Sequence, residues 1–171
     1  MNIGLKIVTA SLFAISIVAC GSSSDNKNVS DSDLEGSWIG KCDVDGASSD
    51  QDFLLFTDKT MTVQHIEFSN PTCNKVDNEI LKDETVDFSY VLGDNITASG
   101  KNANKINFTK TGYHVSKGNT NTIPNFGEVT YQTIYLENKK IFLGKTDKEH
   151  NATSDATRPT ILDFTDPIIK K

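Results

Sequence analysis

Histidine, the side chain that most often acts in acid–base catalysis, is sparse in this chain, and its spacing matches no catalytic pattern. The three histidines, His65, His114 and His150, lie far apart in the sequence and share no metal-ligand spacing. The chain has no His-Glu-x-x-His zinc motif, no Gly-x-Ser-x-Gly nucleophile elbow and no glycine-rich phosphate loop. We therefore predict a protein that is not an enzyme, with no catalytic residue, no metal ligand and no cofactor.

Four aspartates around a short turn are the strongest candidates for an ion site. Asp43, Asp45, Asp50 and Asp52 supply the carboxylate oxygens that Ca²⁺ prefers. The EF-hand loop needs a glycine at its sixth position, whereas Gly46 is the fourth residue counted from Asp43. The pattern therefore favours a solvated acidic loop.

The first nineteen residues are typical of an export signal. Lys6 provides a positive charge, and residues 7–19 are mostly Ile, Val, Leu, Phe and Ala. This apolar stretch is shorter than the roughly 20 residues that a membrane-spanning helix needs. Its length and flanking residues predict a secretory signal peptide over residues 1–19.

The end of that signal resembles the lipobox of bacterial lipoproteins. It reads Ile17-Val18-Ala19-Cys20-Gly21, in which an aliphatic residue and small residues precede a cysteine. The resemblance implies that Cys20 is the first mature residue and carries acyl chains such as palmitate, which anchor the protein to a membrane. Gly21, where some lipoproteins have aspartate, implies the outer membrane and its periplasmic face. The alternative is an ordinary signal peptide followed by an unrelated cysteine.

The residues that follow Cys20 predict a tether and then one domain. Residues 21–33 are rich in Ser and Asp and nearly devoid of apolar side chains. Such a segment buries too little surface to offset its ordering entropy, so residues 20–33 are expected to form a flexible lipidated tether. Residues 34–171 then form a single domain, which is long enough for one core.

Cys42 and Cys73 are left for pairing once Cys20 is assigned to the lipid. An even pair in an exported chain predicts a disulfide. A bond closing a loop of this length stabilises the fold by about 3–4 kcal/mol in the chain-entropy model. A metal site or a catalytic thiol is the alternative, but the chain has no Cys-x-x-Cys motif and no histidine close to either cysteine.

The net charge of −6 and the single arginine, Arg158, limit the classes of partner. Nucleic-acid binding requires a basic patch, and docking to anionic lipid heads requires clustered basic residues. Neither interaction is therefore expected.

Two-residue alternation of apolar and polar side chains predicts an all-β fold. Val86, Phe88, Tyr90 and Leu92, for example, alternate with mostly polar residues. Eight or nine strands are expected, at 37–44, 52–57, 60–68, 86–92, 96–99, 106–115, 129–136, 141–143 and 160–165. Successive hairpins favour an antiparallel up-and-down barrel of about eight strands, with a β-sandwich as the alternative, because a closed barrel leaves no exposed strand edge.

Local patterns predict turns, one bulge and one helical turn. The turns are expected at 58–59, 93–95 and 138–139. A change of apolar phase between Val63 and Ile66 predicts a β-bulge near Gln64 and His65. Residues 78–83 indicate a helical turn.

The start of the predicted domain resembles the lipocalins and related calycin barrels. Gly36-Ser37-Trp38 is a Gly-x-Trp motif at the first predicted strand. In that family the tryptophan closes one end of the barrel, and a basic residue from near the last strand packs across it. Arg158 precedes the last predicted strand, and an arginine stacks well on an indole ring. The resemblance therefore implies that Trp38 and Arg158 are neighbours.

The chain also resembles a loose group of small proteobacterial lipoproteins. Gly36, Trp38 and Cys42 match the start of their domain, and Cys73 matches a second cysteine. Their ending is similar to Arg158-Pro159-Thr160-x-Leu162-Asp163.

The favoured function is carriage of a small apolar ligand by a membrane-anchored, non-catalytic lipoprotein of the cell envelope. One alternative is a protein-binding or inhibitor module, similar to lysozyme-inhibitor lipoproteins, with loops at 47–50, 117–125 and 146–157 contacting a basic protein partner. Another is a structural envelope component. Carriage requires that seven large aromatic residues do not fill the barrel, namely Phe53, Phe56, Phe88, Tyr90, Phe108, Tyr131 and Phe142.

Overall fold

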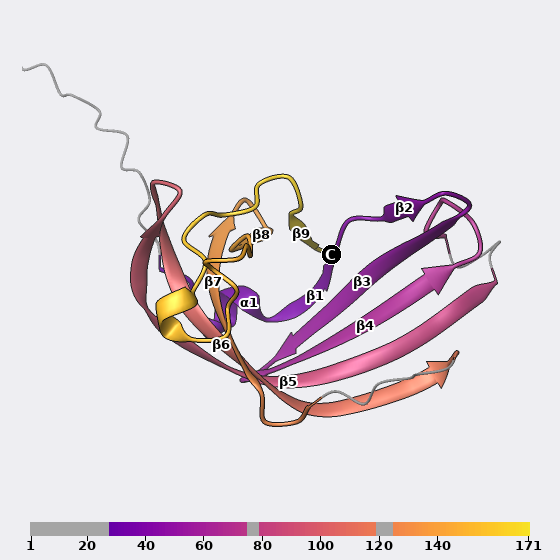
Figure 1. Cartoon of the computed structure of the whole chain (residues 1–171), viewed down its shortest axis with the longest axis horizontal. Coiled ribbons are helices and arrows are strands. Elements are labelled where there is room, and N and C mark those ends of the chain that lie inside the picture. The colour runs from indigo at the N-terminus through magenta and orange to yellow at the C-terminus, as the bar shows by residue number, and fades with distance from the viewer. Residues whose placement is uncertain (1–27, 75–78, 119–124) are drawn as a thin grey trace, which may run out of the picture.

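The computed structural model describes residues 28–74, 79–118 and 125–171, whose regular secondary structure is almost entirely β-strand (Figure 1). The prediction of an all-β protein is confirmed. In chain order the elements are α1 (Asp31–Leu34), β1 (Gly36–Ile39), β2 (Asp43–Asp45), β3 (Ser48–Thr57), β4 (Thr60–Phe68), β5 (Ile80–Ala98), β6 (Lys101–Lys117), β7 (Val129–Glu137), β8 (Lys140–Leu143), the 3-10 turn η1 (Asp155–Thr157) and β9 (Ile168–Lys170).

Eight of these strands close into an antiparallel barrel, as predicted. The hydrogen-bonded order is β1-β9-β8-β7-β6-β5-β4-β3, and β1 also pairs with β3, which completes the ring. The register across that closure is set by Trp38 opposite Leu54 and Ile39 opposite Phe53. The remaining strand, β2, pairs only with the start of β3.

The strands on one side of the barrel are much longer than those on the other. β5 has 19 residues and β6 has 17, whereas β8 has 4 and β9 has 3. β6 pairs with β7 only from Asn104 to Thr109, so its second half continues beyond the barrel. Figure 1 shows β3 to β6 projecting past the short strands as a curved sheet. We call this part the sheet extension, and it comprises residues 48–52, 64–68, 80–85 and 110–117.

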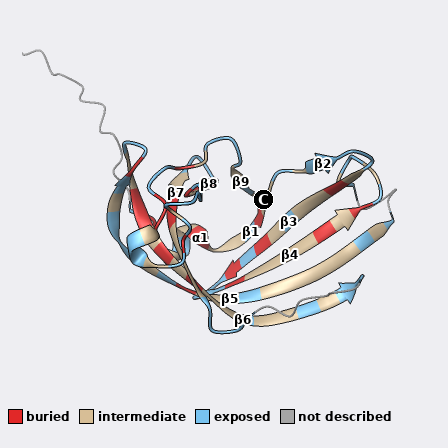
Figure 2. Cartoon of the chain, in the orientation of Figure 1, coloured by how far each residue is buried: buried red, intermediate tan, exposed pale blue. Residues whose placement is uncertain are grey.

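One end of the barrel is closed by a dense apolar cluster. Leu34, Trp38 and Ile106 are each at most 1% exposed, and the buried part of this region is red in Figure 2. The Trp38 indole N–H donates to the Leu34 carbonyl at 2.6 Å. The Tyr90 hydroxyl donates to the Asp58 carbonyl at 2.8 Å, and burial together with the nearby Asp31 and Glu35 carboxylates raises the pKa of Tyr90 to about 12.

The short helix α1 lies across this closed end. Lys59, from the turn between β3 and β4, forms an ion pair with Asp31 at 3.4 Å. Lys170, from β9, donates to the Asp33 carbonyl at 3.2 Å. The packed chain begins before Leu34, because Val29 is 7% exposed and its N–H donates to the Asn104 side chain at 2.9 Å. At least residues 29–33 of the expected tether are therefore part of the folded domain.

The segment between β8 and β9 covers the outer face of the barrel. Leu162 packs with Ala98, Ala103 and Tyr135 in a second, smaller apolar cluster. The prediction that residues 160–165 form the final strand is wrong, since Leu162 makes only an isolated bridge with Gly144. The strand that closes the barrel is β9, and the apolar residues of 160–165 reflect packing onto the sheet rather than pairing within it.

Three local predictions are also wrong. The chain keeps regular register at Gln64 and His65, because Val63 faces the barrel interior while Ile66 is buried on the opposite face of the sheet; the register shift lies between Glu67 and Phe68. Residues 93–95 form an irregularity within β5, which continues to Ala98. Residues 80–83 belong to β5 rather than to a helical turn, and residue 78 lies outside the described residues.

Two predicted turns are confirmed. The chain reverses at 58–59 between β3 and β4 and at 138–139 between β7 and β8. Asp58, Asn138 and Lys139 have φ of 52°, 51° and 60°, the left-handed conformation that tight hairpins use.

Candidate ligand-binding cavity

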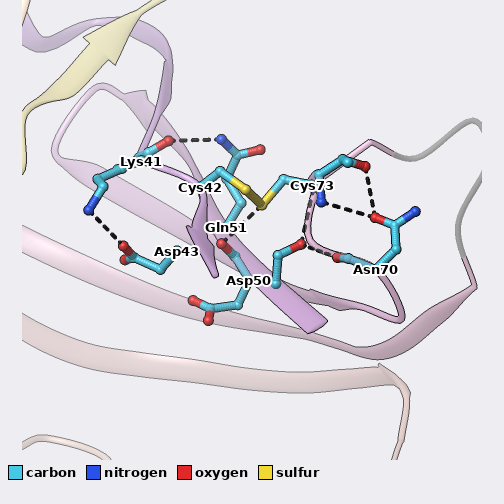
Figure 3. The surroundings of a disulfide bond; sticks show 10 residues. Lys41, Cys42, Asp43, Asp50, Gln51, Asn70 and Cys73 are labelled. Carbon is cyan, nitrogen blue, oxygen red and sulfur yellow. Dashed lines mark hydrogen bonds and ion pairs between the residues drawn. A yellow bond between two sulfur atoms is a disulfide. The ribbon is translucent and has the colours of Figure 1, made fainter. Parts of the chain in front are cut away.

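The predicted disulfide is present and ties two loops together beside the sheet extension (Figure 3). Cys42 lies between β1 and β2, Cys73 follows β4, and their Cα atoms are 5.9 Å apart. The Cys73 N–H donates to the Ser49 hydroxyl at 3.0 Å, and that hydroxyl donates to the Asn70 carbonyl at 2.6 Å. The disulfide thus joins the loop after β4 to the loop before β2, and the Ser49 hydrogen bonds hold the loop after β4 against β3.

Trp38 occupies the position that the lipocalin resemblance implies, but Arg158 does not. Trp38 is buried inside the closed end of the barrel. The cation above its ring is Lys170, with Nζ 5.0 Å from the ring centroid. Arg158 instead lies 5.5 Å from the ring centroid of Tyr131. The expectation that Arg158 packs across Trp38 is therefore corrected, because the basic residue at this end comes from β9.

Arg158 holds the covering segment against the outside of the barrel wall. Its side chain is 4% exposed and pairs with Asp155 at 2.8 Å. The guanidinium also donates to the Ile106 carbonyl at 3.0 Å, to the Asn107 side chain at 2.7 Å and to the Gln132 carbonyl. These partners lie on β6 and β7, so Arg158 fastens η1 to both strands.

The barrel contains a cavity of about 570 Å³ that is open to solvent. The cavity wall is apolar toward the closed end of the barrel and polar toward the opposite end. The apolar wall is formed by Leu54, Phe56, Met61, Val63, Val86, Phe88, Phe108, Ile134, Ile141, Leu143 and Ile168. None of the residues that close the barrel end (Leu34, Trp38 and Tyr90) lines the cavity, so they lie beneath its floor.

The cavity exists because only part of the aromatic set points inward. Phe56, Phe88, Tyr90 and Phe108 belong to the interior cluster, where the ring centroids of Phe56 and Tyr90 are 5.6 Å apart. The other three aromatic residues contact groups outside the barrel wall. Phe53 lies beneath Lys171, Tyr131 beneath Arg158, and Phe142 packs against Tyr135 and Phe164.

Charged side chains surround the open end of the cavity, which we call the mouth. They are Asp43, Asp50, Asp52, Asp163, Asp166, Lys41, Lys110 and Lys145. Lys41 pairs with Asp43 at 3.1 Å, and the hydrogen bond that Lys41 donates to this carboxylate raises the pKa of Lys41. Partial burial, together with the neighbouring Asp43 carboxylate, raises the pKa of Asp166. The mouth therefore concentrates negative charge.

A paired polar network continues from the mouth onto the sheet extension. His65 Nδ1 lies 2.8 Å from Asp52 Oδ1, and this hydrogen bond raises the pKa of His65. Lys82 donates to Glu84 at 2.8 Å, and Tyr113 donates to the same carboxylate at 2.6 Å. Burial opposes ionisation of Glu84, but these two donors outweigh it and lower the pKa of Glu84.

The remaining sequence candidates lie apart from one another. His114 is exposed on β6, and His150 contacts Asp147 in the segment after β8. Of the four aspartates near the first turn, Asp43, Asp50 and Asp52 line the mouth, whereas Asp45 does not. No group of three His, Cys, Asp or Glu side chains within 28–74, 79–118 and 125–171 is placed to hold a metal ion. Cys20 lies outside these residues.

Comparison of the chain with models of known protein families and with curated protein sequences finds no match. Among the residues that the structure describes, no helix is long and apolar enough to cross a membrane.

Sequence reasoning missed the residues that form the mouth from the C-terminal side. Asp163 lies within residues 160–165, which the sequence pattern predicts as the final strand, and Asp166 and Ile168 lie in a stretch with no predicted element. The one available signal was Ile168-Ile169, an apolar pair close to the C-terminus. That pair is too short to indicate a strand without knowledge of its partners β1 and β8.

Proposed function

We propose that this protein is a non-catalytic lipoprotein, anchored in the cell envelope through Cys20, which carries a small apolar ligand inside its barrel. The observation that carries the proposal is the cavity of about 570 Å³ within a closed barrel. Small-molecule sites have volumes of roughly 300–1,000 Å³, and small barrels hold one ligand in this way.

The lining of the cavity supports an apolar ligand. Phe88 and Phe108 have their ring centroids 6.1 Å apart, and both form part of the wall. Val63, Val86 and Leu143 are only partly buried although they point into the barrel. A ligand that covers these side chains removes apolar surface from water, which stabilises the complex by about 25 cal/mol per Å².

The closed end supports a binding site with one opening. Leu34, Trp38 and Tyr90 pack beneath the cavity, with α1 across them. A ligand therefore enters and leaves through the mouth, and the barrel shields the rest of it from water.

Native mass spectrometry of residues 21–171, which include every described residue, tests carriage. We expect additional mass that is lost on extraction with organic solvent. Val63→Trp places a large side chain in the cavity and is expected to abolish that mass. Leu55→Trp on the neighbouring strand is the matched control, because Leu55 points outward and is 48% exposed.

Absence of bound mass would contradict carriage if the folded protein also failed to bind a fluorescent apolar probe. Circular dichroism and thermal unfolding of both variants establish that they fold. In that outcome the protein-binding alternative would be tested next, through salt-sensitive binding to a basic protein such as lysozyme.

The anchor is tested separately on the full chain expressed in a Gram-negative bacterium. We expect partition into the detergent phase, an acylated peptide beginning at Cys20, and fractionation with the outer membrane. Cys20→Ser is expected to abolish all three. Equal partition of the two proteins would contradict lipidation and leave the carriage proposal untouched.

A further inference from the structure

The wall of the cavity would orient a bound ligand, because its polarity changes from the closed end to the mouth. At the closed end the lining is Phe56, Met61 and Ile134, which are each at most 6% exposed. At the other end the lining changes to charged side chains from β3 and from the segment before β9. An amphipathic molecule is therefore held with its apolar body inward and its polar end at the mouth.

The charges at the mouth are unequal in sign. Five carboxylates face three ammonium groups among the residues that line the cavity, a difference of two negative charges (5 − 3). Two of the lysines are already engaged, Lys41 with Asp43 at 3.1 Å and Lys110 with Glu128 at 3.3 Å. The third, Lys145, acts on Asp163, whose pKa is lowered by hydrogen bonds from Thr165 and, to a smaller extent, by the Lys145 charge. The carboxylates of the mouth still outnumber its cations.

Asp166 is the carboxylate with the clearest lack of a partner. Within the described part of the chain its side chain accepts no hydrogen bond and forms no ion pair. Burial and then the negative charge of Asp43, with smaller effects of Asp163 and Asp52, raise the pKa of Asp166, and Lys41 is the cation that opposes them. A positive group brought to this position would relieve like-charge repulsion, and a negative group would increase it.

The carboxylates of the mouth are not gathered for a metal ion. Within the ranges that the structure describes, no three acidic, histidine or cysteine side chains converge as metal ligands. They are distributed around an opening above an apolar chamber, an arrangement that fits a larger organic group.

We infer that the ligand is an amphipathic organic cation, with an apolar body against Phe56, Phe88 and Phe108 and an amine or ammonium group at the mouth near Asp163 and Asp166. This inference rests on the proposed carrier function and adds the chemical class of the ligand. Anionic amphiphiles such as fatty acids are disfavoured by the same charges that favour the cation.

Three probes with the same alkyl chain test the inference: dodecyltrimethylammonium and dodecanoate, each below its micelle concentration, and dodecanol below its solubility limit. Binding to the mature chain is measured by isothermal titration calorimetry and by displacement of a fluorescent apolar probe. We expect the cation to bind at least about tenfold more tightly than the anion, with the alcohol between them. The difference is expected to shrink as salt is raised, because the mouth is open to solvent.

Two variants locate the effect. Asp163→Asn combined with Asp166→Asn keeps the size of both side chains and is expected to remove most of the preference for the cation. Asp94→Asn is the matched control, since Asp94 is exposed on β5 outside the set of residues that line the cavity. Binding of dodecanol is expected to be unchanged in every variant.

Each outcome has a distinct meaning. Equal binding of the three probes, or tighter binding of dodecanoate, would overturn the inference and leave the carrier proposal standing. An unchanged cation preference in the double variant would overturn the assignment to Asp163 and Asp166. Failure of all three probes to bind the folded protein would overturn the carrier proposal itself.

Discussion

The ammonium group of Lys170 lies over the indole ring of Trp38, with Nζ 5.0 Å from the ring centroid. Lys170 belongs to β9 and Trp38 to β1, and the two residues lie opposite each other where these strands pair. The same ammonium group donates to the Asp33 carbonyl at 3.2 Å. One side chain therefore joins the last strand, the first strand and the helix at the closed end.

We predict that the closed end is the most sensitive part of the fold. Trp38→Ala is expected to lower the free energy of unfolding by about 3–5 kcal/mol, because it leaves a large cavity in the core. Lys170→Met is expected to lower it by about 1 kcal/mol through loss of the cation–π contact. Urea unfolding followed by circular dichroism measures both changes.

Lys171→Met is the matched control for Lys170→Met. Lys171 also lies over an aromatic ring, 4.7 Å from the centroid of Phe53, but on the outside of the barrel at the last residue. A smaller effect is expected for this variant. If Lys171→Met cost as much as Lys170→Met, the special role of the closed end would be refuted.

Arg158 is predicted to stabilise the segment that covers β6 and β7. Arg158→Met is expected to lower the free energy of unfolding by at least about 2 kcal/mol, since it leaves buried carbonyl acceptors without a charged donor. Lys105→Met removes a cation from the same Asp155 carboxylate, yet Lys105 is 32% exposed at its side chain and is expected to contribute about 0–1 kcal/mol. Chemical denaturation measures the difference between the variants, and equal effects would contradict the role assigned to Arg158.

The disulfide is predicted to stabilise the fold without contributing to the ligand site. Replacing both Cys42 and Cys73 with serine is expected to lower the free energy of unfolding by about 3–4 kcal/mol, the entropy of a loop with a sequence separation of 31 residues. Affinity for an apolar probe is expected to stay the same under conditions where the variant is folded. Loss of probe binding in the folded double variant would show that the bond also shapes the mouth.

The sequence was informative where one face of a strand is buried and the other is exposed. Phe88 and Tyr90 alternate with polar neighbours, and both proved to be interior residues of β5. The turn at 58–59 followed from local backbone preferences. The closed barrel followed from a succession of such hairpins.

The sequence was less informative where both faces of the sheet are covered. Phe53 and Phe142 resemble interior residues, but their partners Lys171 and Phe164 lie outside the barrel. Alternation alone does not tell which of two covered faces is the interior. Arg158 was misplaced for a related reason, because its position depends on how the long segment after β8 crosses the outer wall, and no periodic pattern records that path.

The stability of the sheet extension is predicted to depend on pH through His65. Its hydrogen bond to Asp52 Oδ1, at 2.8 Å, raises the pKa of His65 above its ordinary value of 6.5. Asp50, Glu67 and Glu84 also lie near the imidazole, with Glu67 Oε1 3.8 Å from Nε2. The folded state favours the imidazolium form of His65. Protonated His65 therefore stabilises the fold fully at pH values below its pKa in the unfolded chain, and this stabilisation is lost as the pH rises through its higher pKa in the folded protein. The free energy of unfolding is therefore expected to fall between about pH 6 and pH 8 in the natural protein, and to change less in His65→Gln.

His114→Gln, on the same sheet but exposed, is the control. Urea unfolding across this range and NMR titration of the His65 ring provide the measurement, and an identical pH profile for the natural protein and His65→Gln would contradict the prediction.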